Sequence, residues 1–214
     1  MMMIGAAKNT KAPEATGAND SKAKTLSSVP SDQNVSNWGA TPDDWAHFDK
    51  VLGLGADLLP VVSNPEAEIS PRSSMSSKGK VPSRYDSSRR VIGLSEWPTK
   101  VVTAQERSRW SREADFGICI RTTLVRGLDV DVANQVLAQE VRDAIQSELG
   151  LSLPIRSRSN SPKFLIPFRL AGEYGKRVIF CEGEGEGTDK IECLMNGQQF
   201  IACGTHPSGS RYEW

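Results

Sequence analysis

The stretch RGLDVDVANQ, residues 126 to 135, places Asp129 and Asp131 inside a short apolar run that is typical of a buried strand. Successive side chains of a strand alternate between its two faces, so both acids point the same way, about 6.5–7 Å apart. Val130 and Val132 then point into the core. Burying carboxylates without a partner is expensive, so we expect the acidic face to border a cleft or a metal.

The chain around this strand predicts further strands and one long helix. FGICI (116–120) is expected to be a strand that forms a hairpin with LVRGLDVDV through a short RTT turn. From Val132 to Leu149 the apolar residues take a helical period, and Gly150 is a plausible residue to end the helix. Five short strands are expected after it, with an Asn-Gly hairpin turn at MNGQ (195–198) between the last two: LPIRSRS, KFLIPFRL, KRVIFCEG, KIECLM and QQFIACG.

The N-terminal half is less regular. Residues 1 to 36 have almost no large apolar side chains, which predicts a disordered tail and a folded domain over residues 37 to 214. TPDDWAHF (41–48) and TAQERSRWSR (103–112) are expected to be helices with threonine N-caps, and LLPVV a short strand. Residues 63 to 90 predict a long polar loop. The whole pattern indicates an α+β fold with a mostly antiparallel sheet.

Composition excludes several classes of protein. Lys plus Arg and Asp plus Glu both number 26, so bulk charge does not favour nucleic-acid binding, although local patches can. The four cysteines have no CxxC spacing and are expected to be buried, reduced side chains. No apolar run approaches the roughly 20 residues of a membrane span, and no glycine-rich phosphate loop is present. The sequence predicts a soluble, intracellular protein.

Carboxylates without His or Cys nearby favour Mg²⁺ or Mn²⁺, and two such ions about 3.5–4 Å apart support phosphoryl transfer. Glu192, a lone acid in an apolar strand, is the best candidate for a third ligand. The acids of CEGEGEGTDK alternate with glycines and are interpreted as a solvated hairpin tip. The alternative for Asp129 and Asp131 is a strand end whose acids simply face water.

Positive charge is segregated along the chain. Residues 70 to 100 carry seven Lys or Arg against two acids, and residues 156 to 177 carry six against one. Each run can be a solvated loop. Placed around an acidic metal cluster, they would instead suit a nucleotide and a nucleic-acid backbone.

An ordered set of motifs gives a family resemblance that covers roughly residues 38 to 214. The motifs are GKVPS, GLSEWPTK, RSRW, ADFGICI, GLDVDV, IRSRSNSPKFLIPFRL and KIECLMNGQQFIACGTHPSGSRYEW. In this order they resemble the bifunctional primase–polymerase (prim-pol) domain of phages and plasmids, a branch of the archaeo-eukaryotic primase superfamily. The resemblance implies an antiparallel catalytic core of the RNA-recognition-motif type, joined to an N-terminal α/β unit.

The resemblance also implies roles for individual residues. Asp129 and Asp131 match the family's first motif and Glu192 its third, so these acids would be catalytic and hold two Mg²⁺ or Mn²⁺ ions. The second motif usually contains a His, which RSRSNSPKF lacks. Lys163, with Arg158 or Arg156, would supply the positive charge for the nucleotide instead.

Other residues are expected to contact the nucleotide or the DNA. His206, in GTHPSG, is expected to contact the nucleotide or template, the alternative being a turn residue held by its neighbours. Lys80 would contact a phosphate, or would be a mobile loop cation. The expected nucleic-acid contacts are Arg84, Arg89, Arg90 and Arg169.

The expected function is that of a DNA primase and DNA-directed DNA polymerase in phage or plasmid replication. Its partners would be a DNA template or primer, dNTPs or NTPs, and a helicase that either follows in the chain or is a separate protein. The protein would be a monomer in the cytoplasm of the bacterial host, without membrane contact. The alternatives are a metal-dependent nuclease, which would use the same acids, and a non-catalytic nucleic-acid-binding module of replication.

Overall fold

The computed structural model describes residues 37–150, 152–182 and 188–214. They belong to one compact unit, residues 36–214. The expected tail, residues 1 to 36, and most of the expected hairpin tip, residues 183–187, lie outside the described residues.

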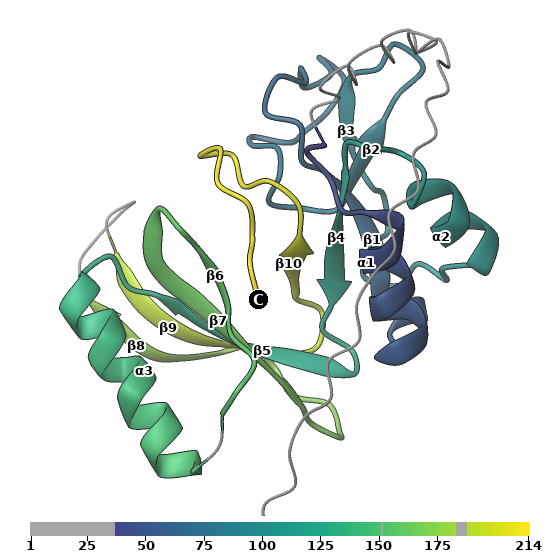
Figure 1. Cartoon of the computed structure of the whole chain (residues 1–214). Helices are drawn as coiled ribbons and strands as arrows, with labels where there is room; N and C mark the ends of the chain where they lie inside the picture. The colour runs from purple at the N-terminus through teal and green to yellow at the C-terminus, as the bar shows by residue number, and fades with distance from the viewer. Residues whose placement is uncertain (1–36, 151, 183–187) are drawn as a thin grey trace, which may run out of the picture. The chain divides into compact units, whose positions relative to one another are not determined.

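The described unit combines short helices with three antiparallel sheets (Figure 1). This confirms the α+β class. The elements are α1 (Pro42–Ala46), the π-helix η1 (His47–Val51), the 3-10 helix η2 (Gly55–Asp57), β1 (Leu58–Val62), β2 (Ser83–Tyr85), β3 (Val91–Gly93), α2 (Ala104–Trp110), β4 (Phe116–Arg121), β5 (Val125–Asp131), α3 (Gln135–Leu149), β6 (Arg156–Arg158), β7 (Ser161–Arg169), β8 (Arg177–Glu182), β9 (Asp189–Leu194) and β10 (Gln199–Cys203).

The largest sheet has five strands in the order β6-β7-β5-β9-β8, with the acidic strand β5 in the centre. Val130 and Val132 are fully buried and pack with Phe164 and Ala138, so α3 covers one face of this sheet. The acids therefore lie on the other face, as the alternation predicted. Asn134 caps α3 at its start, and Gly150 ends it in a left-handed conformation with φ of 60°.

β5 and β6, which α3 connects, are not neighbours in the sheet, because one strand lies between them. β7 fills this gap and pairs antiparallel with both β5 and β6, so β5 and β6 run parallel to each other. β9 then pairs with the other edge of β5. This is a split β-α-β arrangement.

A second sheet, in the order β1-β4-β10, forms the N-terminal part of the unit together with α1 and α2. Its strands are almost wholly apolar, and they pack with Leu165 and Leu194 from the five-stranded sheet. The acidic face of that sheet is thus partly covered by the second sheet. The three cysteines whose side chains are described are unpaired; Cys119 and Cys203 are buried as expected, whereas Cys193 is only partly buried.

Two predicted hairpins are wrong, although their turns form. β4 does not pair with β5, and β9 does not pair with β10, because in each case the chain leaves one sheet and enters the other. At MNGQ the turn closes, with Gln198 N–H donating to the Met195 carbonyl at 3.1 Å, and the strands then separate. The guanidinium of Arg126, almost fully buried, donates to the Thr122 carbonyl at this junction.

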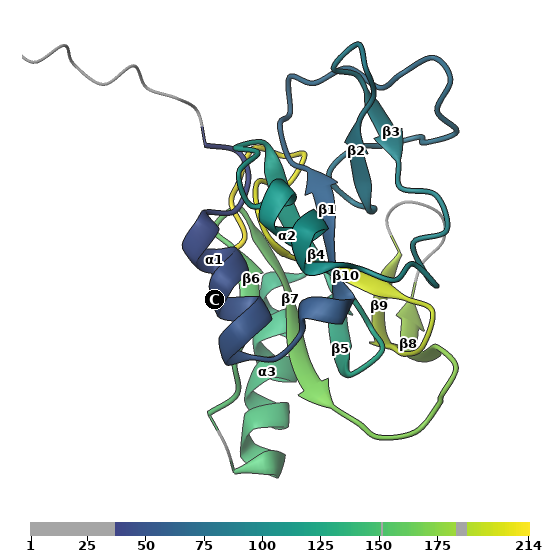
Figure 2. The same cartoon turned by 90° about the vertical axis from the view of Figure 1, so that its right-hand side faces the viewer.

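The predicted polar loop over residues 63 to 90 is also interrupted by structure. β2 pairs with β3 in a two-stranded sheet, and Figure 2 shows this sheet beside β1. The hydroxyl of buried Ser83 accepts from the Val62 N–H at 2.9 Å, which anchors β2 to β1. Three strand residues surrounded by serines and arginines carry too little periodicity to be recognised from sequence.

The threonine N-cap of α2, predicted from sequence, is part of a capping box and gives a modest test of the fold. The Thr103 hydroxyl accepts from the Glu106 N–H at 3.2 Å, and the Glu106 carboxylate accepts from the Thr103 N–H at 3.0 Å. Thr103→Ala should lower the free energy of unfolding by about 1 kcal/mol, which is roughly 2–4 °C in Tm for a domain of this size. Thermal denaturation measures this, with exposed Thr123→Ala as control. Equal melting of both variants would contradict a capping role.

Candidate functional site

A pocket of about 260 Å³ opens on the acidic face, beside β10 and the segment that follows it. It brings together seven of the predicted site residues. These are Asp129, Asp131, Arg156, Arg158, Lys163, His206 and Lys80. Residues from β5, β6, β7 and two distant loops thus meet in one hollow, which no local sequence pattern shows.

The acids and one arginine lie in a row across the sheet. Asp129 stands directly opposite Glu192 on β9, and on its other side opposite Leu165 on β7, which in turn faces Arg156 on β6. Directly opposed residues of antiparallel strands point to the same face. Glu192 therefore shares the face of Asp129, although it does not line the pocket and only 7% of its side chain is exposed.

Each of the three acids has a basic partner. Lys163 Nζ lies 2.6 Å from Asp131 Oδ1, and Arg156 Nη2 lies 3.9 Å from Asp129 Oδ1. The two oxygens of Glu192 are taken by lysines: Nζ of Lys176 lies at 2.8 Å and Nζ of Lys190 at 3.3 Å. The acidic cluster is therefore neutralised by the side chains of its own sheet.

The electrostatics of Asp129 show the cost of gathering these acids. Burial raises the pKa of its carboxyl, and the charges of Asp131 and Glu192 raise it further, while Arg156 and Lys190 oppose the rise. Burial also lowers the pKa of the Arg156 guanidinium. A carboxylate in this position gains from any additional cation that enters the pocket.

Among residues 37–150, 152–182 and 188–214, no group of three or more His, Cys, Asp or Glu side chains is arranged to hold a metal ion. Asp129 and Asp131 nevertheless offer, in one pocket, the oxygen donors that Mg²⁺ and Mn²⁺ prefer. They fit a divalent cation if Lys163 leaves Asp131. Glu192 fits as a further ligand only if its two lysines are displaced.

Tyr212 lines the same pocket and was missed by the sequence reasoning. The Arg156 guanidinium lies 4.6 Å and that of Arg158 5.9 Å from its ring centroid, so the ring supports both arginines. The chain is held here by Ser157 and Glu213, which exchange backbone hydrogen bonds of 2.9 and 3.0 Å. The aromatic residues of RYEW (211–214) were the available signal for this site. No local pattern indicated that this segment lies beside β6.

His206 is fixed in one tautomer by its donors. Arg158 Nη1 lies 2.6 Å from His206 Nδ1, and the Ser208 N–H donates to the same nitrogen at 3.0 Å. Because both partners donate, Nδ1 accepts and the proton of the neutral ring is on Nε2. Burial first, and then the charges of Arg158 and Lys80, lower the pKa of His206 to about 4.

The titration of His206 is directly measurable. We expect NMR of the folded protein to give a pKa near 4 with an Nε2–H tautomer above it. The unfolded chain then binds more protons between about pH 4 and pH 6.5, so stability should fall as the pH drops through that window. His206→Gln should remove part of this pH dependence. An ordinary pKa near 6.5 would contradict the contacts described.

The four arginines predicted to contact nucleic acid are not gathered in one place. Arg84 is exposed, and Arg90 lies 3.5 Å from Glu68. Arg89 is paired with Glu113 at 2.8 Å and lies over a tyrosine ring. Arg169 donates to the Leu52 carbonyl at 2.6 Å. Only Arg84 and Arg90 share a groove.

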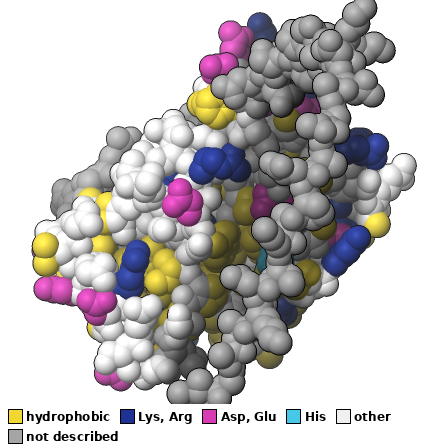
Figure 3. All heavy atoms as spheres, viewed as in Figure 1, with side chains coloured by type: hydrophobic (Ala, Val, Ile, Leu, Met, Phe, Trp, Pro, Cys, Tyr) yellow, Lys and Arg dark blue, Asp and Glu magenta, His cyan; other side chains and the backbone are white. Residues whose placement is uncertain are grey.

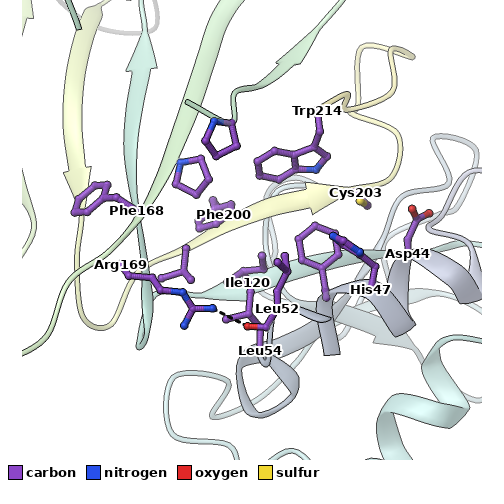
Figure 4. A pocket seen from close by; sticks show the side chains of 14 residues that line it. Asp44, His47, Leu52, Leu54, Ile120, Phe168, Arg169, Phe200, Cys203 and Trp214 are labelled. Carbon is purple, nitrogen blue, oxygen red and sulfur yellow. Dashed lines mark hydrogen bonds between the residues drawn. The ribbon is translucent and has the colours of Figure 1, made fainter. Parts of the chain in front are cut away.

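Arg169 belongs to a larger and mostly apolar pocket of about 570 Å³ (Figure 4). Its walls include Phe48, Leu52, Phe200 and Trp214. Hydrophobic side chains also reach the surface on the face shown in Figure 3. The one acid in the pocket wall, Asp44, is held in the capping box of α1.

Comparisons with protein-family models, with curated proteins and with solved structures give no match for this chain. Fold and site therefore define a class only, an α+β protein with antiparallel sheets and a pocket of paired acids and bases on one of them. No helix in the described part of the chain is long and apolar enough to cross a membrane.

Proposed function

We propose that this protein is a template-directed nucleotidyltransferase, a DNA primase or DNA polymerase of the prim-pol type. One observation carries the proposal. Asp129 and Asp131 share a single pocket with Lys163, Arg158 and His206, so metal-binding oxygens and phosphate-binding cations lie side by side. A nucleoside triphosphate with its divalent ions has this pairing of charges.

The strand order supports the finer fold proposal. β6-β7-β5-β9 around α3 is the order expected of an RNA-recognition-motif type core, and the β1-β4-β10 sheet with α1 and α2 would be the N-terminal α/β unit. The β-α-β-β-α-β order has a second helix between its third and fourth strands. The described residues between β7 and β8 form no such helix. The acidic residues lie on the face opposite α3, which the second sheet partly covers.

In this mechanism Asp129 and Asp131, and Glu192 once released from its lysines, would hold two Mg²⁺ or Mn²⁺ ions. Bound there, the ions would lower the pKa of the attacking 3′-hydroxyl and stabilise the pyrophosphate leaving group. Lys163 would exchange its ion pair with Asp131 for a phosphate oxygen of the nucleotide. Catalysis would then rest on positioning and electrostatics, and no protein nucleophile is needed.

The basic side of the pocket would bind the triphosphate. Arg158 and Arg156 are held against the Tyr212 ring, which limits their side-chain freedom before the nucleotide arrives. His206 would offer its Nε2–H as a neutral donor. Lys80, exposed at the pocket rim, would add a cation for phosphate.

The substrates of this proposal are a DNA template or primer and dNTPs or NTPs. A replication helicase, a phage or plasmid origin, a monomeric state and a location in the bacterial cytoplasm stay predictions. They follow from the resemblance alone.

Incubation with single-stranded template, labelled dNTPs or NTPs and Mg²⁺ or Mn²⁺ tests the proposal. We expect template-dependent dinucleotide synthesis or primer extension. Shortened DNA would replace the proposal by a metal-dependent nuclease. DNA binding with neither product would favour a non-catalytic replication module.

Lys163→Ala tests the nucleotide side of the pocket. Loss of one charge-assisted hydrogen bond to phosphate, about 1.5–3 kcal/mol, should raise the KM for the nucleotide by roughly 10–100-fold. Stability should change by less than about 1 kcal/mol, because the Lys163–Asp131 pair is about one-third exposed. Steady-state kinetics with exposed Lys50→Ala as control checks this. An unchanged KM would exclude Lys163 from the nucleotide site.

A further inference from the structure

A second polar groove, of about 810 Å³, lies beside the two-stranded β2–β3 sheet. Three arginines line it, Arg72, Arg84 and Arg90, and most of the remaining wall is serine. The serines come from residues 70–74, 87–88 and 95. The sequence predicts a polar loop over much of this region, with Arg84 and Arg90 as nucleic-acid contacts, and it does not single out Arg72 or the serines.

The arginines of this groove have few acidic partners. Within the described part of the chain Arg72 and Arg84 form no ion pair, and Arg90 has only the exposed contact with Glu68 at 3.5 Å. Arg89, the neighbour outside the groove, is instead paired with Glu113. The groove wall therefore carries a net positive charge, with three arginines against the single carboxylate of Asp86.

The acid in the groove wall, Asp86, is committed to the turn. Its Oδ1 accepts from the Ser88 N–H at 2.9 Å and from the Arg90 N–H at 3.0 Å. These bonds hold the 86–90 turn, in which Arg89 has a φ of 58°. The carboxylate thus fixes the position of Arg90 and does not pair with the other two arginines.

The groove is linked to the acid-lined pocket by one short segment. Lys80, at the pocket rim, is followed by Val81, Pro82 and then β2, which carries Arg84. Gly79 packs so closely on Pro207 that an added Cβ would lie 3.1 Å from the proline ring. Arg84 also lines a second depression, of about 470 Å³, whose wall includes Arg109.

We propose that this groove binds the phosphates of the single-stranded template, with Arg72, Arg84 and Arg90 as the main contacts. The inference rests on the proposed function and places its template. Arginine and serine side chains are common donors to phosphate oxygens. A protein partner would instead favour aromatic and apolar anchors, and the wall of this groove offers few. The contacts are to the backbone and carry no base specificity.

Salt-dependent binding of a fluorescent oligo-dT, measured by anisotropy in EDTA without nucleotide, tests the inference. Loss of two phosphate contacts in the Arg72→Ala/Arg84→Ala variant should reduce the slope of log K against log salt by about 1.4, at about 0.7 per contact. Arg112→Ala is the matched control, since Arg112 is exposed, lies outside the groove and bonds through its side chain to Ser108 near the end of α2. The control should keep the wild-type slope.

An unchanged slope in the double variant would overturn the inference, as would an equal loss in Arg112→Ala. Polyglutamate that competes as well as oligo-dT at equal charge would also overturn it, because the groove would then recognise anions generally. The measurement needs no catalysis. If the double variant lost the expected slope but the wild type gave no product in the synthesis assay, the proposed function would be rejected, whereas the groove would still be a DNA-binding site.

Discussion

Replacing both acids of the central strand, Asp129→Asn with Asp131→Asn, is expected to reduce templated nucleotide incorporation at least about 1,000-fold. Asparagine keeps the shape of each side chain and removes its charge. Divalent ions at such a site supply several kcal/mol of stabilisation to the transition state, and about 4 kcal/mol corresponds to a thousandfold in rate. Incorporation of labelled nucleotide over time measures the loss.

The fold should survive this change. The two side chains are 31% and 34% exposed, and their ion pairs are weak or partly solvated, so the free energy of unfolding should change by about 1 kcal/mol or less. Asp143→Asn on α3, an exposed acid whose carboxylate accepts from Gln139, is the control and should retain activity. A folded double variant that still polymerised would place the chemistry elsewhere.

Arg126→Met should destabilise the protein by about 3 kcal/mol or more. The guanidinium is 1% exposed and donates to the Thr122 carbonyl, to the Gly172 carbonyl at 2.9 Å and to Asn196 Oδ1 at 2.8 Å. Thr122 and Asn196 lie in the two connections by which the chain passes between the sheets, and Gly172 lies between β7 and β8 of the five-stranded sheet. Methionine fills part of the volume but leaves the buried Thr122 carbonyl without this donor, which costs about 1–3 kcal/mol, and it also removes the two partly buried bonds to Gly172 and Asn196.

Urea denaturation of Arg126→Met measures the effect. Thr123→Ala, an exposed change in the same connection, is the control and should lie within about 0.5 kcal/mol of the wild type. If Arg126→Met cost less than about 1 kcal/mol, the junction between the sheets would not depend on this arginine.

The local elements could be predicted because their signals are local. The helical period after Val132, the threonine caps and the LLPVV run each specify one element without reference to distant residues. Alternation in β5 likewise placed Asp129 and Asp131 opposite the valines. All these predictions rest on side-chain periodicity or helix capping. Neither signal depends on which strands pair with each other.

Strand partners could not be predicted in the same way. All five residues of FGICI are buried, so the run lacks an alternation that would tie it to β5 in preference to β1 and β10. The Asn-Gly turn was correct, yet a turn only brings strands together and does not oblige them to pair. Which strands pair depends on how the two sheets pack. The buried Arg126 contributes to this packing.

The residues of the candidate site show the same difference between local signals and long-range packing. Asp129 and Asp131 could be selected by type and spacing, and the family resemblance supplied the five basic residues that meet them in one pocket: Lys80, Arg156, Arg158, Lys163 and His206. Tyr212 could not, because its role depends on a C-terminal segment that returns to β6. Arg169 resembled the other basic residues in sequence, but β7 carries it to the apolar pocket.

A crystal structure with Mn²⁺ and a non-hydrolysable dNTP tests the central claim most directly. Anomalous scattering locates the manganese independently of the nucleotide. We expect Mn²⁺ on Asp129 and Asp131, with Lys163 moved from Asp131 to the triphosphate and Arg158 beside it. Nucleotide bound elsewhere, with the Lys163–Asp131 pair intact and no manganese at the two acids, would contradict the nucleotidyltransferase assignment.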